Sequence, residues 1–144
     1  MNNKGFSLVE LMIVILILGL FAVYTYPSYR NSIAQARRVD GQTALLTLAN
    51  RMEAYYSQQQ SYQGATIATG NESDILGTNY SEQSWYRLEI TEQTDTHFSL
   101  QAIPIKAQAT ADKLCQTLTF NSLGVKGISA GPMGLPRGQS SQCW

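Results

Sequence analysis

The chain begins with MNNKGFSLVELMIVILIL (residues 1–18), which places a glutamate inside an otherwise apolar run. From Phe6 to Tyr26, Glu10 is the only charged side chain. About twenty apolar residues in a helix match the thickness of a bilayer, whereas a carboxylate in hydrocarbon costs roughly 2.5 kcal/mol or more on insertion scales. The run therefore predicts a membrane helix in which Glu10 needs a partner that compensates its charge.

Two ordinary explanations of this run fit it poorly. A secretory signal peptide usually has a shorter apolar region, and the nearest A-x-A pattern, at residues 34–36, lies well past the end of this one. A plain single-pass anchor, held with Lys4 in the cytoplasm, is a better alternative. It explains neither Glu10 nor the Gly5-Phe6 pair that precedes the apolar run.

The segment KGFSLVEL (residues 4–11) resembles the class III signal of type IV prepilins and of the related pseudopilins of type II secretion. The resemblance implies that a membrane-embedded prepilin peptidase cuts after Gly5 and methylates Phe6, the new N-terminal residue. Cleavage creates an ammonium group beside the bilayer, and a carboxylate four residues later can compensate that charge. In a filament, the partner of Glu10 is then expected to be the Phe6 ammonium of a neighbouring subunit.

Gly19 and Pro27 also match this family, in which the helix between these positions can melt when the subunit leaves the membrane. The physical reason is local, because Gly weakens a helix by about 1 kcal/mol and Pro by about 3 kcal/mol relative to Ala. We expect one long helix from about Phe6 to Gln60, bent near both residues. Gly41, inside the predicted helix, argues against full continuity.

Beyond Pro27 the apolar residues follow helical spacing, which predicts that this half of the helix packs on a sheet. The predicted apolar positions are Val39, Leu45, Leu48, Met52 and Tyr55 or Tyr56, and the residues expected on other faces are Arg37, Arg38, Asp40 and Arg51.

Alternating patterns predict strands after a polar connecting loop at residues 65–83. The alternating apolar residues are Tyr86, Leu88 and Ile90, then Phe98, Leu100 and Ala102, then Leu114, Leu118 and Phe120; a turn at 121–124 precedes a fourth strand at 125–128. The predicted fold class is therefore α+β, a long N-terminal helix packed on an antiparallel sheet of about four strands. The resemblance to prepilins implies that this is the type IV pilin fold, with a C-terminal disulfide-bounded loop.

Two cysteines, Cys115 and Cys143, lie near the C-terminus. An even, minimal count beyond a membrane segment favours a disulfide in an oxidising compartment, and two unpaired buried thiols are the alternative. In type IV pilins a C-terminal disulfide bounds a variable surface loop, and this pair resembles that arrangement. Residues 115–124 further resemble the C-terminal part of PilE-type minor pilins of Gram-negative bacteria.

The charge balance is neutral, with ten basic and ten acidic side chains, so no global charge favours nucleic acid. Four basic residues of the C-terminal third, Lys106, Lys113, Lys126 and Arg137, could form a DNA-binding face beside aromatic platforms such as Trp144. The alternative is four solvated charges on an ordinary head domain.

The sequence offers few residues that could form a catalytic or metal-binding site. His97 is the only histidine, and the glycines near the C-terminus do not open a helix as a phosphate loop does. Asp112 and Asn121 could supply oxygen ligands, but no acidic cluster has calcium-loop spacing. We expect no enzymatic activity, no cofactor, no metal site and no small-molecule substrate.

The resemblance thus implies a type IV pilus subunit, and residues 115–124 favour a minor one, with a leader at 1–5, a transmembrane and filament-core helix at 6–29, and a head at 30–144. The expected partners are other pilin subunits through the N-terminal helix, the prepilin peptidase and methyltransferase, the inner membrane and, as a further candidate, DNA. The head would lie in the periplasm before assembly and on the cell surface after it. A type II secretion pseudopilin and a DNA-uptake receptor pilin are the two alternative functions.

Overall fold

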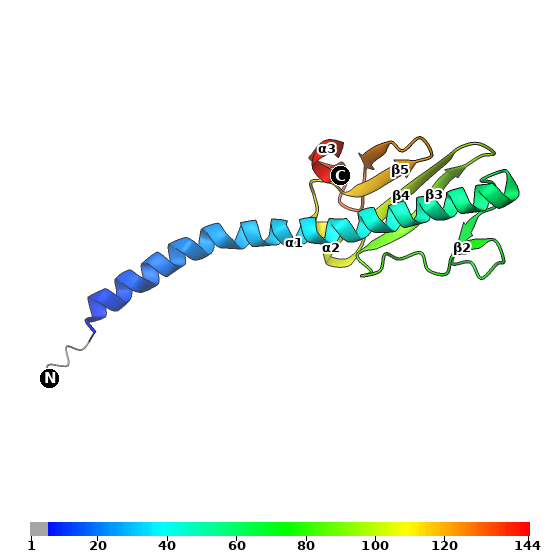
Figure 1. Ribbon diagram of the computed structural model, residues 1–144. Coiled ribbons are helices and arrows are strands. Elements are labelled where there is room, and N and C mark those ends of the chain that lie inside the picture. Colours follow the sequence, from blue (N-terminus) through cyan, green and yellow to red (C-terminus); the bar gives the residue numbers. More distant parts are fainter. Residues whose placement is uncertain (1–5) are drawn as a thin grey trace. The chain divides into compact units, whose positions relative to one another are not determined.

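A computed structural model describes residues 6–144, without the side chains of residues 24–28. One long helix leads into a head built of a small sheet, a four-stranded sheet and two short helices (Figure 1). In chain order, the elements are α1 (Leu8–Gln59), β1 (Thr66–Ile67), β2 (Asp74–Leu76), β3 (Tyr86–Gln93), β4 (Phe98–Pro104), α2 (Lys106–Ala111), β5 (Thr117–Asn121), β6 (Lys126–Ser129) and α3 (Ser140–Cys143).

The chain divides into two compact units, one ending at Ile33 and the other spanning Ala34–Trp144. Helix α1 runs through both units. The second unit holds all of the strands, and we call it the head.

The main sheet of the head has the strand order β3-β4-β5-β6, with every neighbouring pair antiparallel. This arrangement confirms the predicted α+β fold with four antiparallel strands. Leu114 is an exception, because β5 begins only at Thr117 and Leu114 lies outside it, partly exposed. The predicted connecting loop at 65–83 contains the short parallel pair β1 and β2, which has no alternating pattern to reveal it.

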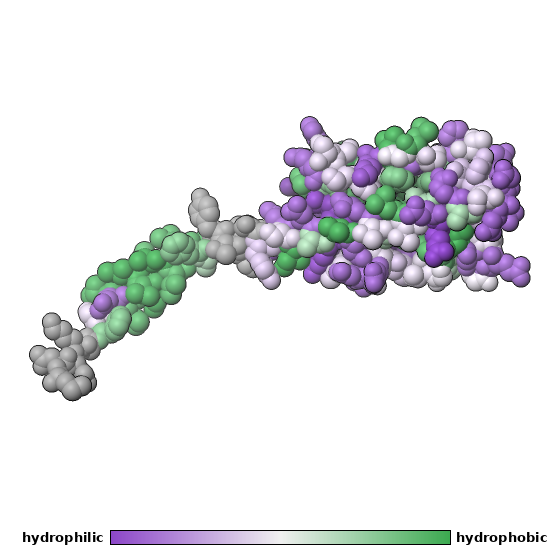
Figure 2. Space-filling view, viewed as in Figure 1, coloured by the Kyte–Doolittle hydropathy of each residue, from purple (hydrophilic) through white to green (hydrophobic). Residues whose placement is uncertain are grey.

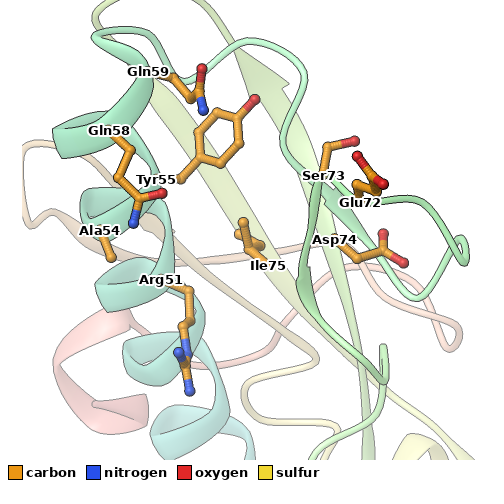
Figure 3. A pocket seen from close by; sticks show the side chains of 9 residues that line it. All are labelled: Arg51, Ala54, Tyr55, Gln58, Gln59, Glu72, Ser73, Asp74 and Ile75. Atoms are coloured by element: carbon orange, nitrogen blue, oxygen red, sulfur yellow. The ribbon is translucent and has the colours of Figure 1, made fainter.

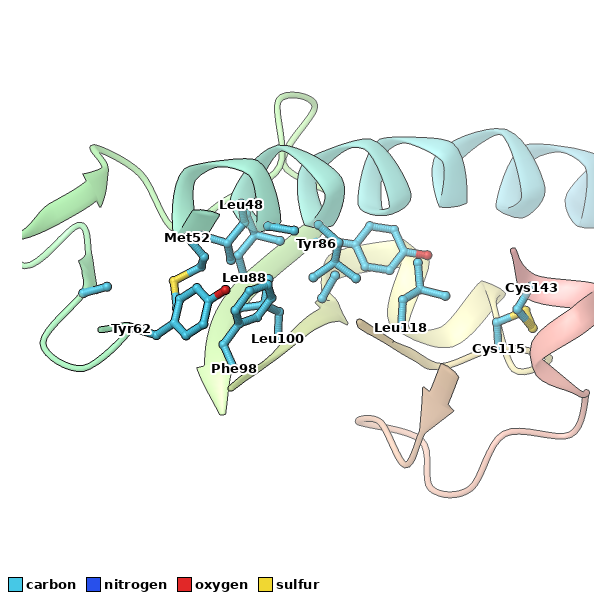
Figure 4. Packing of buried hydrophobic residues seen from close by; sticks show 14 residues of the cluster. Leu48, Met52, Tyr62, Tyr86, Leu88, Phe98, Leu100, Cys115, Leu118 and Cys143 are labelled. Atoms are coloured by element: carbon cyan, nitrogen blue, oxygen red, sulfur yellow. A yellow bond between two sulfur atoms is a disulfide. The ribbon is translucent and has the colours of Figure 1, made fainter. Parts of the chain in front are cut away.

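The core lies between the head part of α1 and the sheet (Figure 4). Leu45, Leu48 and Met52 are fully buried on the helix, at the spacing that the sequence predicts. They pack against side chains from the strands and from the segment after α1, which include Tyr62, Tyr86, Leu88, Phe98, Leu100 and Leu118.

Two positions on α1 differ from the predicted pattern. Val39 is exposed, whereas Arg38, which was expected on a solvent-facing side, is buried. Its guanidinium donates two hydrogen bonds of 2.8 Å to the carboxylate of Asp112, which is also buried. A buried arginine is tolerated where a carboxylate meets it with bidentate geometry, and hydropathy alone does not reveal such a partner.

Gly41 lies on the buried face of α1 and does not interrupt the helix. A Cβ at this position would lie 2.8 Å from Cδ2 of Tyr86, which is closer than carbon atoms can approach. Glycine is therefore required so that the Tyr86 ring can pack flat against the helix backbone.

The C-terminal tail is fixed by a disulfide to the segment that directly precedes β5. Cys115 and Cys143 are bonded, with their Cα atoms 5.6 Å apart, so the predicted pairing is confirmed. The Gln42 side chain on α1 donates a 2.7 Å hydrogen bond to the carbonyl of Cys143. The tail is thereby tied to both the segment before β5 and the helix.

Candidate functional site

The N-terminal unit presents an apolar helix surface with no cover of its own. Every large apolar side chain from Leu8 to Val23 is at least 42% exposed, and Figure 2 shows apolar residues over most of the visible face of this segment. Glu10 is exposed within it and forms no ion pair or side-chain hydrogen bond with any residue that the structure describes. A continuous apolar surface of this kind requires a membrane or a protein partner.

The predicted processing and helix-melting positions can be located only in part. Gly5 lies outside the described residues, and Phe6 is exposed at their beginning. The helix runs unbroken through Gly19 and Pro27, so melting between them stays a prediction. Within the described residues, no helix combines the length and the apolarity needed to cross a membrane.

Charge is segregated within the head, although the whole chain is neutral. Residues 34–97 carry four basic and eight acidic side chains, whereas residues 98–144 carry four basic and one acidic. The single acid, Asp112, is buried in its pair with Arg38. The exposed charge of residues 98–144 therefore comes from the four predicted cations alone.

The structure brings two of these cations together. The amide of Arg137 donates a 3.2 Å hydrogen bond to the carbonyl of Lys113, so the two residues are adjacent. The amide of Gly138 continues the contact with a 2.8 Å bond to Leu114. Both cationic side chains are exposed, and neither forms an ion pair with a described residue.

The other two cations have different environments. Lys126 lies over the ring of Trp144, with Nζ 5.2 Å from the ring centre, and Trp144 follows the disulfide-bonded Cys143. Lys106 begins α2 with a φ of 54°, a left-handed conformation that few residues other than glycine adopt. No contact joins Lys106 to the other three cations within the described residues.

Trp144 is not a free platform for base stacking. Its indole N–H donates a 2.9 Å hydrogen bond to the carbonyl of Gly127, and its ring lies against Phe120, with 6.1 Å between the ring centres. Because Lys126 lies over the ring as well, the indole is part of the head's own packing. The predicted aromatic contribution of Trp144 to a DNA face is thus not available without rearrangement.

Other candidate sites contain no convergent chemistry. A surface depression of about 620 Å³ lies between the end of α1 and the segment before β2 (Figure 3). Arg51 lies on its helix side and Glu72 and Asp74 lie on the opposite side, so the charged groups do not meet. His97 lies exposed in the turn before β4, not in a strand. Among the described residues, no group of three potential metal ligands occurs.

Comparison with known protein families gives a direct result. Residues 27–119 match the family described as type IV minor pilin ComP, DNA uptake sequence receptor, and residues 1–26 match the prokaryotic N-terminal methylation motif. The chain belongs to this family of type IV minor pilins. Lys106 and Lys113 lie inside the matched stretch, whereas Lys126 and Arg137 lie beyond it.

Individual relatives agree with this assignment. The chain is 32% identical over 61 residues to the type IV major pilin PilA of Myxococcus xanthus, a match that covers 42% of this chain and 28% of PilA. It is 30% identical over 75 residues to the fimbrial protein EcpC of Eikenella corrodens, covering 52% of this chain and 49% of EcpC. The chain thus spans between about a quarter and a half of the length of these curated relatives.

A solved pilin shares the fold. The crystal structure of the non-core minor pilin PilV of Neisseria meningitidis superposes with a TM-score of 0.53 at 22% identity, covering 76% of this chain and 99% of PilV. The match of residues 27–119 to the minor pilin family favours the pilus over the type II secretion filament.

Proposed function

We propose that this minor pilin is cut after Gly5, methylated at Phe6 and held in the pilus by its N-terminal helix. The match of residues 1–26 to the N-terminal methylation motif supports the processing step. The domain boundaries of the proposal are a leader at 1–5, a helix at 6–29 and a head at 30–144. The prepilin peptidase and methyltransferase, the inner membrane and neighbouring pilin subunits are the partners it requires.

The uncovered surface of the N-terminal helix carries the assembly part of the proposal. Exposed apolar side chains from Leu8 to Val23 would be buried first by the inner membrane and then by the helices of neighbouring subunits. Glu10 would pair with the Phe6 ammonium of a neighbour, because an unpaired carboxylate in that apolar bundle would be penalised by several kcal/mol. Gly19 and Pro27 would let the helix between them melt on entry into the filament.

Mass spectrometry of the N-terminus from native pili tests the processing step. We expect a chain that begins with methylated Phe6, and an intact Met1 or cleavage near Ala36 would contradict the proposal. For assembly, Glu10→Val should leave insertion and cleavage intact while the subunit disappears from sheared pili. Glu10→Asp, which keeps the charge, is the matched control and should retain more incorporation than Glu10→Val.

A second function, binding of duplex DNA by the head, is supported by the segregation of charge. The family description names a DNA uptake sequence receptor, and the four exposed cations of residues 98–144 have no exposed acidic side chain in that segment to oppose them. Phosphate contacts by Lys and Arg supply most of the sequence-independent affinity of such proteins.

Salt-dependent binding to a duplex, measured on the full-length chain in a non-ionic detergent, tests this second function. Four phosphate contacts predict a slope of about −3.6 in log K against log salt concentration. Alanine at Lys106, Lys113, Lys126 and Arg137 together should abolish binding, whereas Arg51→Ala, in the acid-rich part of the head, should leave it unchanged. Absence of binding at low salt would exclude the function.

A further inference from the structure

Leu135 is the most exposed large apolar side chain of the head, at 80%. It lies in the segment 131–138, which we call the 131–138 loop. Single exposed leucines are common on protein surfaces. For Leu135, the loop is fixed both before and after it, and two cations lie close to it in the same part of the head.

The part of the loop before Leu135 is fixed to the start of β5. The Gln116 side chain accepts a 3.2 Å hydrogen bond from the amide of Met133. Gly131 lies so close to Gln116 that a Cβ would be 2.6 Å from its Oε1, and Gly131 and Gly134 exchange backbone hydrogen bonds of 2.9 and 3.0 Å. Gln116 itself has a φ of 51°, a left-handed conformation that few residues other than glycine adopt.

The part of the loop after Leu135 is fixed to the segment that follows α2. Arg137 and Gly138 donate their amides to the carbonyls of Lys113 and Leu114. Gly138 packs directly on Leu114, because a Cβ there would be 2.8 Å from Cγ of that residue. Pro136 further restricts the backbone of Leu135 to extended conformations. Contacts with distant segments therefore hold the backbone both before and after Leu135.

Two cations lie close to Leu135 in this part of the head. Arg137 follows Leu135 by two residues, so their Cα atoms are at most about 7 Å apart. Lys113 is hydrogen-bonded to Arg137 through the backbone. An exposed apolar side chain close to two exposed cations suits a partner that offers both an apolar surface and anionic groups.

We propose that Leu135 inserts between two stacked base pairs of duplex DNA while the neighbouring Lys113 and Arg137 contact phosphates near that step. This inference rests on the DNA-binding function proposed above. Leucine is among the side chains that proteins insert as wedges between base steps, and the resulting kink costs least at flexible pyrimidine–purine steps. The wedge would give the head a preference among sequences without a hydrogen-bonding contact to a base edge.

The test uses the full-length chain in a non-ionic detergent and two short duplexes that differ only in a central TA or AA step, each with 2-aminopurine at that step. We expect 2-aminopurine fluorescence to rise on binding, more with the TA duplex. Leu135→Ala should abolish the rise in fluorescence and weaken the affinity for DNA about ten-fold, which corresponds to the free energy of burying one leucine side chain. The slope of log K against log salt concentration should stay unchanged, because no cation is removed. Leu135→Phe, which supplies another wedge side chain, should restore both the rise and the affinity.

Two further variants separate the wedge from general charge effects. Leu123→Ala removes a leucine of similar exposure, 76%, at the opposite end of β5, roughly 17 Å along the strand from Gln116, and should change neither signal. Lys113→Gln with Arg137→Gln should reduce the salt slope by about 1.8.

The outcomes distinguish this inference from the function on which it rests. DNA binding that responds to the cations but not to Leu135 would overturn the wedge and leave the DNA-binding function standing. No binding to either duplex would overturn both. Leu135-dependent binding to anionic lipid vesicles, with no Leu135-dependent change in 2-aminopurine fluorescence, would overturn the wedge in favour of a membrane-contacting loop.

Discussion

Arg38 and Asp112 lie 74 positions apart in the sequence and form a bidentate ion pair whose side chains are 7% and 1% exposed. The pair joins α1 to the segment between α2 and β5. Asp112 also accepts a 3.2 Å hydrogen bond from the amide of Cys115, and a weaker bond of 3.4 Å links Arg38 to the carbonyl of Gln142. One ion pair thus connects the helix with both ends of the disulfide-bounded region.

Asp112→Asn should lower the free energy of unfolding by about 3–5 kcal/mol, because it leaves the Arg38 charge buried without a counter-charge. Replacing both partners, as Arg38→Met with Asp112→Leu, should recover part of the loss, since no charge then remains in the core. Chemical denaturation monitored by circular dichroism measures both effects.

The matched control is the exposed pair Arg87–Glu89, whose side chains are 44% and 39% exposed. Glu89→Gln should lower the free energy of unfolding by no more than about 1 kcal/mol, because solvent screens an exposed pair. If Asp112→Asn and Glu89→Gln lowered the free energy of unfolding equally, burial would not determine how much the Arg38–Asp112 pair contributes to stability.

Gly41→Ala should destabilise the head by about 1–3 kcal/mol, the usual cost of overpacking, because the added Cβ meets the Tyr86 ring at 2.8 Å. In an open helix the same change would instead stabilise by about 1 kcal/mol. Gly77→Ala is the control, because no atom lies within 4 Å of a Cβ there. A higher melting temperature for Gly41→Ala would refute the packing explanation.

Removal of the disulfide by the double change Cys115→Ala and Cys143→Ala should cost roughly 3–4 kcal/mol, as the chain-entropy model gives for a sequence separation of 28. Amide hydrogen exchange in residues 130–144 should accelerate most, because the tail loses its covalent attachment. Gln42→Ala, which removes one hydrogen bond to Cys143, should cost only about 1 kcal/mol. Unchanged exchange in the tail would contradict this account.

Asp74 gives a prediction in the acid range. A hydrogen bond from the Thr66 hydroxyl, aided by donors from Thr69 and Gly70, lowers the pKa of Asp74 from 3.8 to about 2. Since the folded state favours the ionised carboxylate, the stabilisation is complete above about pH 4 and is lost as the pH falls through 2.

NMR titration of the Asp74 carboxyl measures this shift directly. Thr66→Val, which removes the leading donor, should move the pKa back toward 3.8. A pKa unchanged by Thr66→Val would show that the Thr66 hydroxyl is not the cause of the lowering.

The candidate DNA face shows what a sequence reading can and cannot provide. The four cations and the scarcity of acids after residue 97 can be read directly from the chain. The net charge of the chain does not reveal this segregation, because the excess of acids in residues 34–97 offsets the excess of cations after residue 97. The burial of Asp112, the adjacency of Lys113 and Arg137 and the fixed position of Leu135 depend on contacts between distant segments, which no local pattern encodes.

By itself, the sequence determined the N-terminal motif, the long helix, the four strands and the cysteine pair. Each of these depends on local order: an apolar run, a period of 3.6 or 2, or a count of two. The tertiary structure decided why Gly41 must be glycine, which arginine of α1 is buried and where the C-terminal tail is fixed. Those features arise when α1 meets the sheet and the disulfide closes, because only then do a ring, a carboxylate and a thiol from remote positions come within contact distance.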